Sequence, residues 1–234
     1  MNELLLIGQL IVFYGMVVLT WRLFGKTGLY CWTVLATIAA NIEVLVQIHA
    51  FGMDMTLGNI LFASTFVVTD ILSETSGKPD AHRAVNLGVY ASLLFIVISQ
   101  SWLLFAPNEV DFVMPHLRAV FSNTPRLMLT SLIVYAIVQR FDVFLYHFIW
   151  DRTEKLCGDR KRLLWLRNNL ATILSQLLNN ILFTFGAFYG TFDMATLWSI
   201  VWSSMAIFLV TSLADTPVVY LCRSIRGGTR LSEG

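Results

Sequence analysis

The sequence predicts an all-α polytopic membrane protein with six to seven transmembrane helices. Two observations favour this class. Of the 234 residues, 56% are hydrophobic and only 13% are charged, a balance outside the range of soluble domains. The apolar residues also gather in runs long enough to cross a bilayer. We therefore expect one integral membrane domain over residues 1–234, with the lipid bilayer around it.

Windows of about 20 apolar residues locate the individual helices. The N-terminal window is expected to remain as the first helix, because it lacks the cationic region and small-residue cleavage site of a secretory signal. The connections are short and leave no room for a separate soluble domain. The seven candidate spans are 3–24, 28–50, 56–76, 85–106, 126–149, 168–190 and 195–221.

The positions of Lys and Arg test this count, because cytoplasmic loops carry an excess of both. With Arg140 set aside as intramembrane, one side of the membrane holds only Arg118 and Arg126. The other side holds Arg22, Lys26, Lys78, Arg83, Arg152, Lys155, Arg160, Lys161, Arg162, Arg167, Arg223, Arg226 and Arg230. This asymmetry predicts seven spans, with the N-terminus outside and the C-terminus in the cytoplasm.

The longest outer connection, residues 107–125, carries a short amphipathic pattern. Val113, Leu117, Val120 and Phe121 recur at helical spacing. The spacing is compatible with a short helix at the membrane interface or over a cavity mouth, but we expect a plain surface linker.

The span at 168–190 includes most of the stretch RNNLATILSQLLNNILF (167–183), which places polar side chains in an apolar helix. At 100° per residue these side chains fall within an arc of about 140°. They are Asn168, Thr172, Ser175, Gln176, Asn179 and Asn180. An unpaired amide in hydrocarbon costs several kcal/mol, so this face must contact protein, water or a ligand.

Three further spans carry polar residues in a similar way. Ionisable groups inside a membrane are costly to insert and are functional candidates by default. Over the four spans, the candidate substrate-binding residues are Asn41, Asp70, Glu74, Gln139, Asp142, Asn168, Ser175, Gln176, Asn179 and Asn180.

Helix packing is the alternative explanation of these residues. Ser, Thr, Asn and Gln often bond transmembrane helices to one another, and Arg140 and Arg167 could balance the charge of the carboxylates. Three carboxylates and at least five amides exceed what helix association requires, so a polar, ligand-sized cavity is the better account. Aromatic residues of the same spans could stack on a planar ligand. They are Phe66, Phe141, Phe144, Phe183 and Phe185.

The sequence lacks the parts of known catalytic and metal sites. It has no HExxH or GxSxG motif, and Cys31, Cys157 and Cys222 are scattered. The GKT at 25–27 is no P-loop, because Thr20 stands where the first glycine belongs. We therefore expect no enzyme activity, no catalytic residue, no metal and no cofactor. The net charge of +1 also argues against a nucleic-acid partner.

Three blocks of the chain carry a family resemblance. The first is TLGNILFASTFVVTDILSETSGKPDAHRAVNLG (56–88), with T-D-x-x-x-E followed by G-K. The others are PRLMLTSLIVYAIVQRFDVFLYHF (125–148) and LWLRNNLATILSQLLNNILF (164–183). Together they resemble the queuosine precursor transporter family, also described as the vitamin uptake transporter family.

This resemblance implies a cell inner-membrane importer of 7-deazaguanine bases such as preQ0, preQ1 or queuine. It also implies a fold similar to the substrate-binding subunits of energy-coupling-factor transporters. Where the family often carries aspartate this chain has Asn179, which leaves the choice among these bases open.

The side chains agree with that substrate class. A guanine-like edge presents two adjacent N–H donors to a carboxylate, while its O6 accepts from an amide or Arg. Asp142 or Glu74 would supply the carboxylate. Gln176, Asn179 or Asn180 would supply the amide. At position 7 of the base, a carboxylate would favour the cationic aminomethyl group of preQ1 and an amide the nitrile of preQ0.

Two other functions stay open on the sequence. The chain could be a non-transporting membrane subunit whose polar stripes bind partner helices, or it could import another vitamin-like molecule with an ATP-driven module. Polar stripes sealed inside the monomer favour transport, and a stripe facing lipid favours the subunit. The expected partners are a small purine-like base and either a homo-oligomer or an ATP-driven energising module. Protons carried by Asp70, Glu74 or Asp142 are the alternative source of energy.

Overall fold

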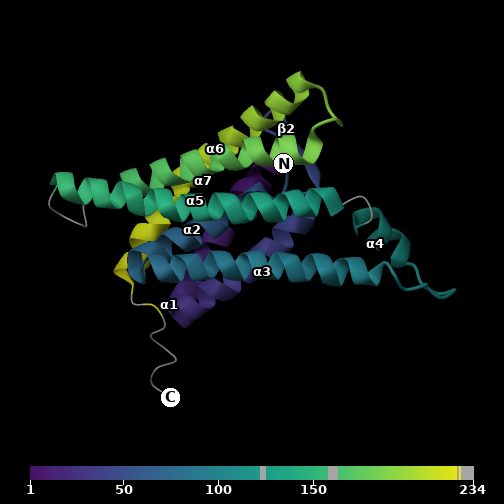
Figure 1. The fold of residues 1–234 in the computed structure, drawn as a ribbon, viewed down its shortest axis with the longest axis horizontal. Coiled ribbons are helices and arrows are strands. Elements are labelled where there is room, and N and C mark those ends of the chain that lie inside the picture. The colour runs from purple at the N-terminus through teal and green to yellow at the C-terminus, as the bar shows by residue number, and fades with distance from the viewer. Residues whose placement is uncertain (122–124, 158–162, 226, 228–234) are drawn as a thin grey trace, which may run out of the picture.

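The computed structural model describes residues 1–121, 125–157, 163–225 and 227, and almost all of its elements are helices (Figure 1). The prediction of an all-α polytopic membrane protein is confirmed, because five helices are long and apolar enough to cross a membrane. In chain order the elements are α1 (Asn2–Glu43), β1 (Gln47–Ala50), β2 (Met53–Thr56), α2 (Asn59–Thr75), α3 (Lys78–Trp102), α4 (Met114–Phe121), α5 (Pro125–Cys157), α6 (Leu164–Phe188) and α7 (Met194–Ser224).

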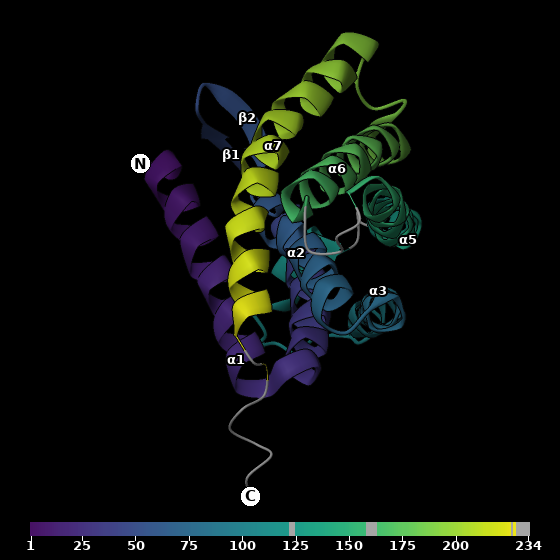
Figure 2. The ribbon, with the colours of Figure 1, turned by 90° about the vertical axis from the view of Figure 1, so that its left-hand side faces the viewer.

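Helix α1 consists of two arms that meet at a sharp bend. Gly25 at the bend has φ 58° and ψ −144°, a conformation that only glycine adopts without strain. Figure 2 shows the chain running from the N-terminus to the bend and back along a second arm. Each arm has about 20 residues, the length of one membrane crossing. The bend therefore separates the first two candidate spans, 3–24 and 28–50.

The second span ends earlier than the sequence predicts. The helix stops at Glu43, and residues 47–50 pair with 53–56 in an antiparallel hairpin. Phe51 and Gly52 form its turn with φ of 53° and 73°, the positive values that a tight two-residue hairpin turn requires. The prediction of helix up to residue 50 is wrong because an apolar window does not separate a helix from a short strand.

Helix α2 lies at the centre of the bundle. It contacts α1, α3, α5 and α7, and the run from Ala63 to Ser73 is buried throughout. Helix α7 lies between the first arm of α1 and α6 (Figure 2). With the two arms of α1 counted separately, the described residues place a helix in each of the seven candidate spans.

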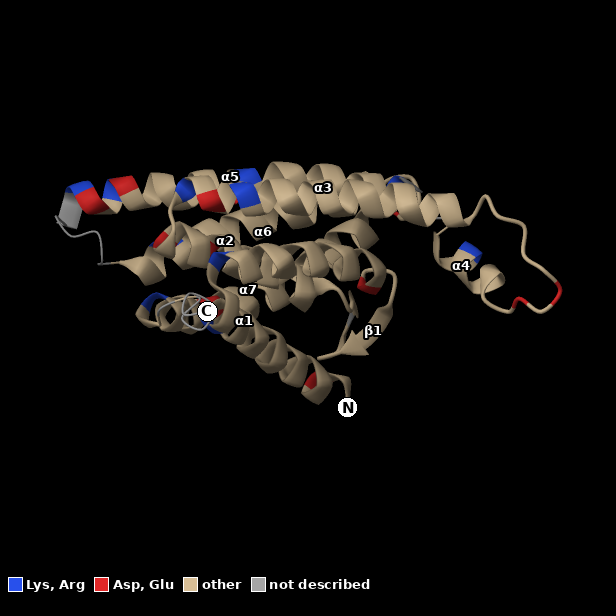
Figure 3. Cartoon of the chain, turned by 90° about the horizontal axis from the view of Figure 1, so that it is seen from below, with Lys and Arg blue, Asp and Glu red and all other residues tan. Residues whose placement is uncertain are grey.

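The two ends of the bundle differ in charge. We call one end the basic end; it holds the bend at Gly25, the α2–α3 junction and the last turns of α5 and α7. The opposite end, with the β-hairpin, α4 and the α6–α7 connection, is called the hairpin end. Figure 3 shows most Lys and Arg toward the basic end, as the span count requires. Five of the predicted cytoplasmic cations lie outside the described residues: Arg160, Lys161, Arg162, Arg226 and Arg230.

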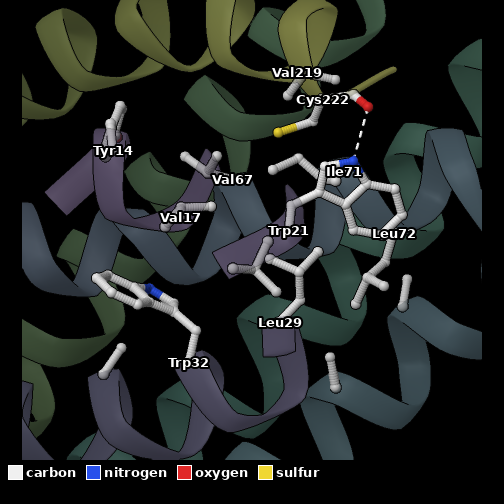
Figure 4. Close-up of a cluster of buried hydrophobic side chains, with 14 of the residues drawn as sticks. Tyr14, Val17, Trp21, Leu29, Trp32, Val67, Ile71, Leu72, Val219 and Cys222 are labelled. Carbon is white, nitrogen blue, oxygen red and sulfur yellow. Dashed lines mark hydrogen bonds between the residues drawn. The ribbon is translucent and has the colours of Figure 1, made fainter. Parts of the chain in front are cut away.

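Apolar packing joins α1, α2 and α7 near the basic end (Figure 4). Leu29, Ile71 and Val219 are completely buried there. The indole N–H of Trp21 donates to the Cys222 carbonyl at 2.9 Å. The first arm of α1 is thus fixed to the last turn of α7.

The expectation of a plain linker over 107–125 is wrong for its second half, because residues Met114–Phe121 form the short helix α4 that the apolar spacing allowed. Its last residue, Phe121, is buried and makes edge-to-face contacts with Phe95 and Trp102 of α3, with ring centroids 6.0 and 5.8 Å apart. The Gln100 amide also donates to the Phe121 carbonyl at 3.1 Å. This helix is therefore anchored on the end of α3.

Candidate functional site

A partly enclosed cavity lies in the half of the bundle nearest the hairpin end. It has a volume of about 80 Å³ and is lined by side chains of α1, α2, α3, α5, α6 and α7. Its position follows from lining residues that lie at helix ends: Val44 at the end of α1, Asn59 at the start of α2 and Phe188 at the end of α6. A space of this size is large enough for several water molecules.

Three of the ten predicted substrate-binding residues line this cavity: Asn41, Asn179 and Asn180. The Asn41 amide donates to the Thr37 carbonyl one turn earlier at 2.8 Å. The Asn180 amide nitrogen is buried and has no hydrogen-bond partner among the described residues. The cavity wall therefore offers both amide donors and amide acceptors.

Aromatic rings form much of the remaining wall. Of the five rings expected to stack on a ligand, only Phe183 lines the cavity, while Phe66 is buried in the core and Phe144 lies on the surface. The sequence placed the rings on the right helices but could not assign their faces. The rings that line the cavity are Phe62, Tyr135, Phe183, Phe188 and Phe208.

A second group of polar residues lies between the cavity and the basic end, and we call it the middle layer: Asp70, Gln139, Asp142, Ser175 and Gln176. All five side chains are buried. Two hydrogen bonds tie this layer to other residues of the bundle. The Gln139 amide donates to the Thr65 hydroxyl at 2.7 Å, and the Thr172 hydroxyl donates to the Asp70 carboxylate at 3.2 Å.

Most polar atoms of the middle layer lack such a bond. Both oxygens of Asp142 and both amide atoms of Gln176 have no hydrogen-bond partner among the described residues. The Ser175 hydroxyl lies near the Asp142 carboxyl but outside hydrogen-bond geometry. Unpaired buried polar atoms are rare in proteins and usually mark water or a functional site.

The Glu74 cluster closes the basic end. The Arg167 guanidinium pairs with the Glu74 carboxylate, with Nε at 2.6 Å, and the two side chains are 0% and 1% exposed. Tyr146 donates to the same carboxylate at 2.8 Å, and Arg223 approaches it at 3.4 Å. The Arg167 cation also lies 4.2 Å from the Trp150 ring centroid. One carboxylate of α2 thus joins α5, α6 and α7.

Two predicted residues have partners other than those expected. Arg140 is exposed and donates to the Asn86 side chain at 2.9 Å and to the Ala136 carbonyl at 2.8 Å. The expectation that it balances a carboxylate is therefore wrong, because its side chain points away from the bundle interior. Asn168 is buried and donates to the Thr216 hydroxyl at 3.3 Å.

Sequence reasoning missed Asp215 and Tyr14. Asp215 is completely buried in α7 and accepts a hydrogen bond from the Tyr14 hydroxyl of α1. The signal was present, because Asp215 is the only carboxylate within the candidate span at 195–221. It was overlooked because it stands alone on its helix rather than in a polar stripe.

The fold defines a multi-pass α-helical membrane protein with a partly enclosed cavity between its helices. Residues 56–222 match the family model described as "Putative vitamin uptake transporter". The chain is also 34% identical over 215 residues, 92% of each protein, to the "Probable queuosine precursor transporter" of Bacillus subtilis (strain 168). The chain therefore belongs to the vitamin uptake transporter family, a family of transport proteins rather than enzymes.

No solved structure matches the chain. The expected similarity to the substrate-binding subunits of energy-coupling-factor transporters therefore stays a prediction.

Proposed function

We propose that this chain imports a queuosine precursor, a 7-deazaguanine base such as preQ0, preQ1 or queuine, and binds it in the cavity at the hairpin end. The observation that carries the proposal is the convergence of four asparagine amides, from Asn41, Asn59, Asn179 and Asn180, and five aromatic rings on one cavity. Amides supply both donors and acceptors for a base edge, and ring faces stack on a planar heterocycle. The name of the relative from Bacillus subtilis points to the same substrate class.

The amides of α6 are the base-reading groups of this proposal. The described lining of the cavity includes no carboxylate, so Asp142 and Glu74 do not face a base bound there. The Asn180 amide nitrogen, which lacks a protein partner among the described residues, donates to O6 of the base. The Asn179 carbonyl oxygen accepts from its N–H edge. A neutral wall favours the nitrile of preQ0 over the cation of preQ1.

The cavity must widen to hold a base. Small-molecule pockets usually have volumes of about 300–1,000 Å³, whereas this cavity has about 80 Å³. Phe183 and Phe188 stand at its wall on the last turns of α6. Binding moves these rings apart, and the base then stacks against them.

The basic end faces the cytoplasm of the inner membrane in this proposal, because Lys and Arg gather there. The cavity then takes up the base from outside, while the Glu74 cluster closes the path to the cytoplasm. A reporter fused to the C-terminus should be cytoplasmic, and one inserted after Asn108 should be outside. The reverse result at either position would overturn the orientation.

A membrane subunit that binds partner helices is the competing function. Its polar stripes would face lipid in the monomer. Here Ser175, Gln176 and Gln139 are completely buried, and Asn179 is 8% exposed. This burial supports transport. It leaves open whether the chain works alone, as a homo-oligomer or with an ATP-driven module.

Binding to the purified protein tests the proposal. The panel is preQ0, preQ1, queuine, guanine, riboflavin and biotin, each measured by calorimetry and by the shift in melting temperature. We expect binding of the 7-deazaguanines and a loss of at least tenfold in affinity in Asn180→Leu. Asn108→Ala, in an exposed loop, is the control and should bind normally. Binding of a vitamin alone would indicate another import substrate, and binding of none would favour the subunit.

A further inference from the structure

Three buried carboxylates meet in the membrane-spanning part of the bundle. Asp70 of α2, Asp142 of α5 and Asp215 of α7 are at most 1% exposed. Helix α2 packs directly against α5 and α7, and Asp70 lies close enough to Asp142 and Asp215 for their charges to interact. The three residues are far apart in sequence, so the fold brings them together.

Their described hydrogen bonds come from neutral hydroxyls, not from cations. Thr172 donates to Asp70, and Tyr14 donates to Asp215. The other oxygens of Asp70 and Asp215, and both oxygens of Asp142, have no hydrogen-bond partner among the described residues. Glu74 differs, because Arg167 and Arg223 compensate its charge.

We infer that Asp70, Asp142 and Asp215 form a shared proton-binding site. A buried carboxylate without a cation is strongly disfavoured as an anion, and three neighbouring anions would also repel one another. Binding a proton removes the charge and supplies an O–H donor. Carboxyl groups inside transmembrane helices commonly mark proton pathways.

Unpartnered polar side chains next to the carboxylates support this inference independently. Gln176 is completely buried and lies one helical turn from Thr172 on the face of α6 that donates to Asp70. Neither of its amide atoms has a partner in the described residues, and the same holds for the hydroxyls of Ser73 and Ser175. These groups bind water molecules that carry protons between the carboxylates.

The same polar groups continue toward the cavity. Gln176 lies one turn from Asn180, which lines the cavity wall. On the neighbouring helices, the Gln139 amide of α5 donates to the Thr65 hydroxyl of α2. Protons thus have a polar route from the cavity to the carboxylates, while the Glu74 cluster lies on the other side.

The ionisable groups around the site come from α1, α2, α5, α6 and α7. They are Tyr14 of α1, Asp142 and Tyr146 of α5, Asp215 of α7, Glu74 of α2 itself, and Arg167 of α6, which is held by Glu74. The described interactions of the three carboxylates involve no ionisable side chain of α3.

Proton release breaks one carboxyl O–H bond, leaves the negative charge on that carboxylate and passes the proton to water.

This site couples transport to proton movement, a consequence that rests on the proposed function. Protons enter from the outer side through the cavity and leave to the cytoplasm when the Glu74 cluster opens. Inward proton flow then drives uptake of the base.

Infrared spectroscopy of the purified protein tests the site without any substrate. Protonated carboxyl groups have a C=O stretching band that ionised carboxylates lack. We expect this band at neutral pH in the wild-type protein, and we expect Asp70→Asn, Asp142→Asn and Asp215→Asn each to reduce it. Asp151→Asn, at an exposed position of α5, is the matched control and should leave it unchanged.

Two further results keep the test decisive. Tyr14→Phe removes the hydroxyl that bonds Asp215 and should shift the band without abolishing it, even if an Asp→Asn variant fails to fold. Absence of the band in the folded wild-type protein, or an unchanged band in all three Asp→Asn variants, would overturn the proton site. A rise in the melting temperature of the wild-type protein with Na⁺, in the absence of the infrared band, would also overturn it, because the carboxylates would then bind a cation instead of protons.

Proteoliposomes test the coupling separately, with preQ0 as the probe. Wild-type uptake should rise at least fivefold when the outside is more acidic than the lumen, and Asp142→Asn should lose this response. Wild-type uptake that ignores the gradient would disprove coupling. If preQ0 neither binds nor moves, the proposed substrate fails, but the infrared result still decides the proton site.

Discussion

The two ends of the bundle are built from the same helices but are held together differently. At the basic end, the Glu74 carboxylate joins α2 to α5, α6 and α7. At the hairpin end, the same helices separate around a cavity whose wall includes the Asn180 amide nitrogen, which has no hydrogen-bond partner in the part of the chain that the structure describes. One end is therefore held by an ion-pair cluster, while the other contains a partly enclosed cavity. In the proposed transport model, this difference gives the hairpin end access to the binding site.

Polar residues at different heights along one helix accordingly have different roles, either in stability or in lining the cavity. On α6, Arg167 and Asn179 are twelve residues apart, or about 18 Å. Arg167 is paired with the Glu74 carboxylate and lies over the Trp150 ring, so it contributes to stability. Asn179 lines the cavity, where we propose that its amide is available to a ligand.

The largest expected effect is on the closed end. Arg167→Met leaves the Glu74 carboxylate buried without its main cation, which should lower the free energy of unfolding by about 3–5 kcal/mol. Thermal unfolding in detergent measures this. Adding Glu74→Gln should recover most of the loss, because no uncompensated charge remains. The control at the hairpin end is Arg126→Met, which removes two exposed bonds to carbonyls and should cost far less. Equal losses would show that the two ends do not differ in this way.

The second effect concerns the open end. Asn179→Leu should weaken binding of the preferred base by about 1–3 kcal/mol, since a polar edge of the ligand loses its partner, while the melting temperature hardly changes. Asn168→Leu should behave in the opposite way, because Asn168 is completely buried and bonds Thr216. Calorimetry and thermal unfolding on both variants separate the two roles. A destabilised Asn179→Leu protein with normal affinity would make Asn179 a packing residue.

Substituting Asn179 by aspartate sharpens the same comparison. A carboxylate in the cavity wall should shift preference from the nitrile of preQ0 toward the cationic aminomethyl group of preQ1, by at least tenfold in the ratio of affinities. An unchanged ratio would place position 7 of the base away from α6.

The bend at the basic end gives a smaller effect. Gly25→Ala forces an L-residue into left-handed backbone and should cost about 1–2 kcal/mol in unfolding free energy. Gly8→Ala lies on the same arm with no atom within 4 Å of the added carbon, so it should be neutral or slightly stabilising. Chemical denaturation of both variants measures the difference. A neutral Gly25→Ala would mean that the two arms of α1 tolerate a different bend.

Much of this arrangement could be predicted from the sequence. Apolar windows located the helices, because a membrane crossing needs a fixed length of apolar chain. The polar face of α6 was also predictable, and all five of its residues proposed for binding are buried. Periodicity assigned that face because 3.6 residues make one turn.

The level of each polar residue in the bundle could not be predicted. Gln139, Ser175 and Gln176 belong to the middle layer and Asn41 to the cavity, yet all four have similar side chains on similar helices. Their level depends on how the helices are staggered, which is a property of tertiary packing. Arg140 was misassigned for the same reason, since only the neighbouring helices decide which side of α5 faces lipid. Asp215 was missed because one carboxylate on a helix gives no periodic signal.

The smallest expected effect lies at the hairpin end, where Asp193 caps α7. Its carboxylate accepts from the backbone N–H groups of Ala195 and Thr196 at 3.2 and 3.4 Å. The Thr196 hydroxyl, which also donates to it, is the main cause that holds the pKa of Asp193 below its ordinary value. The cap therefore stabilises the fold at neutral pH, and its contribution disappears as pH falls through the lowered pKa.

Asp193→Ala should accordingly lower the melting temperature slightly at pH 7 and not at all in strong acid, because the carboxylate is exposed and solvent screens it. Asp193→Asn keeps a side-chain oxygen for the two N–H groups and should retain most of the stability while losing its pH dependence. Melting curves of the three proteins between pH 2 and 7, a range chosen to bracket the ordinary pKa of about 3.9, provide the measurement. If Asp193→Ala costs as much as Arg167→Met, then the hairpin end is held as firmly as the basic end, and the contrast between a closed and an open end fails.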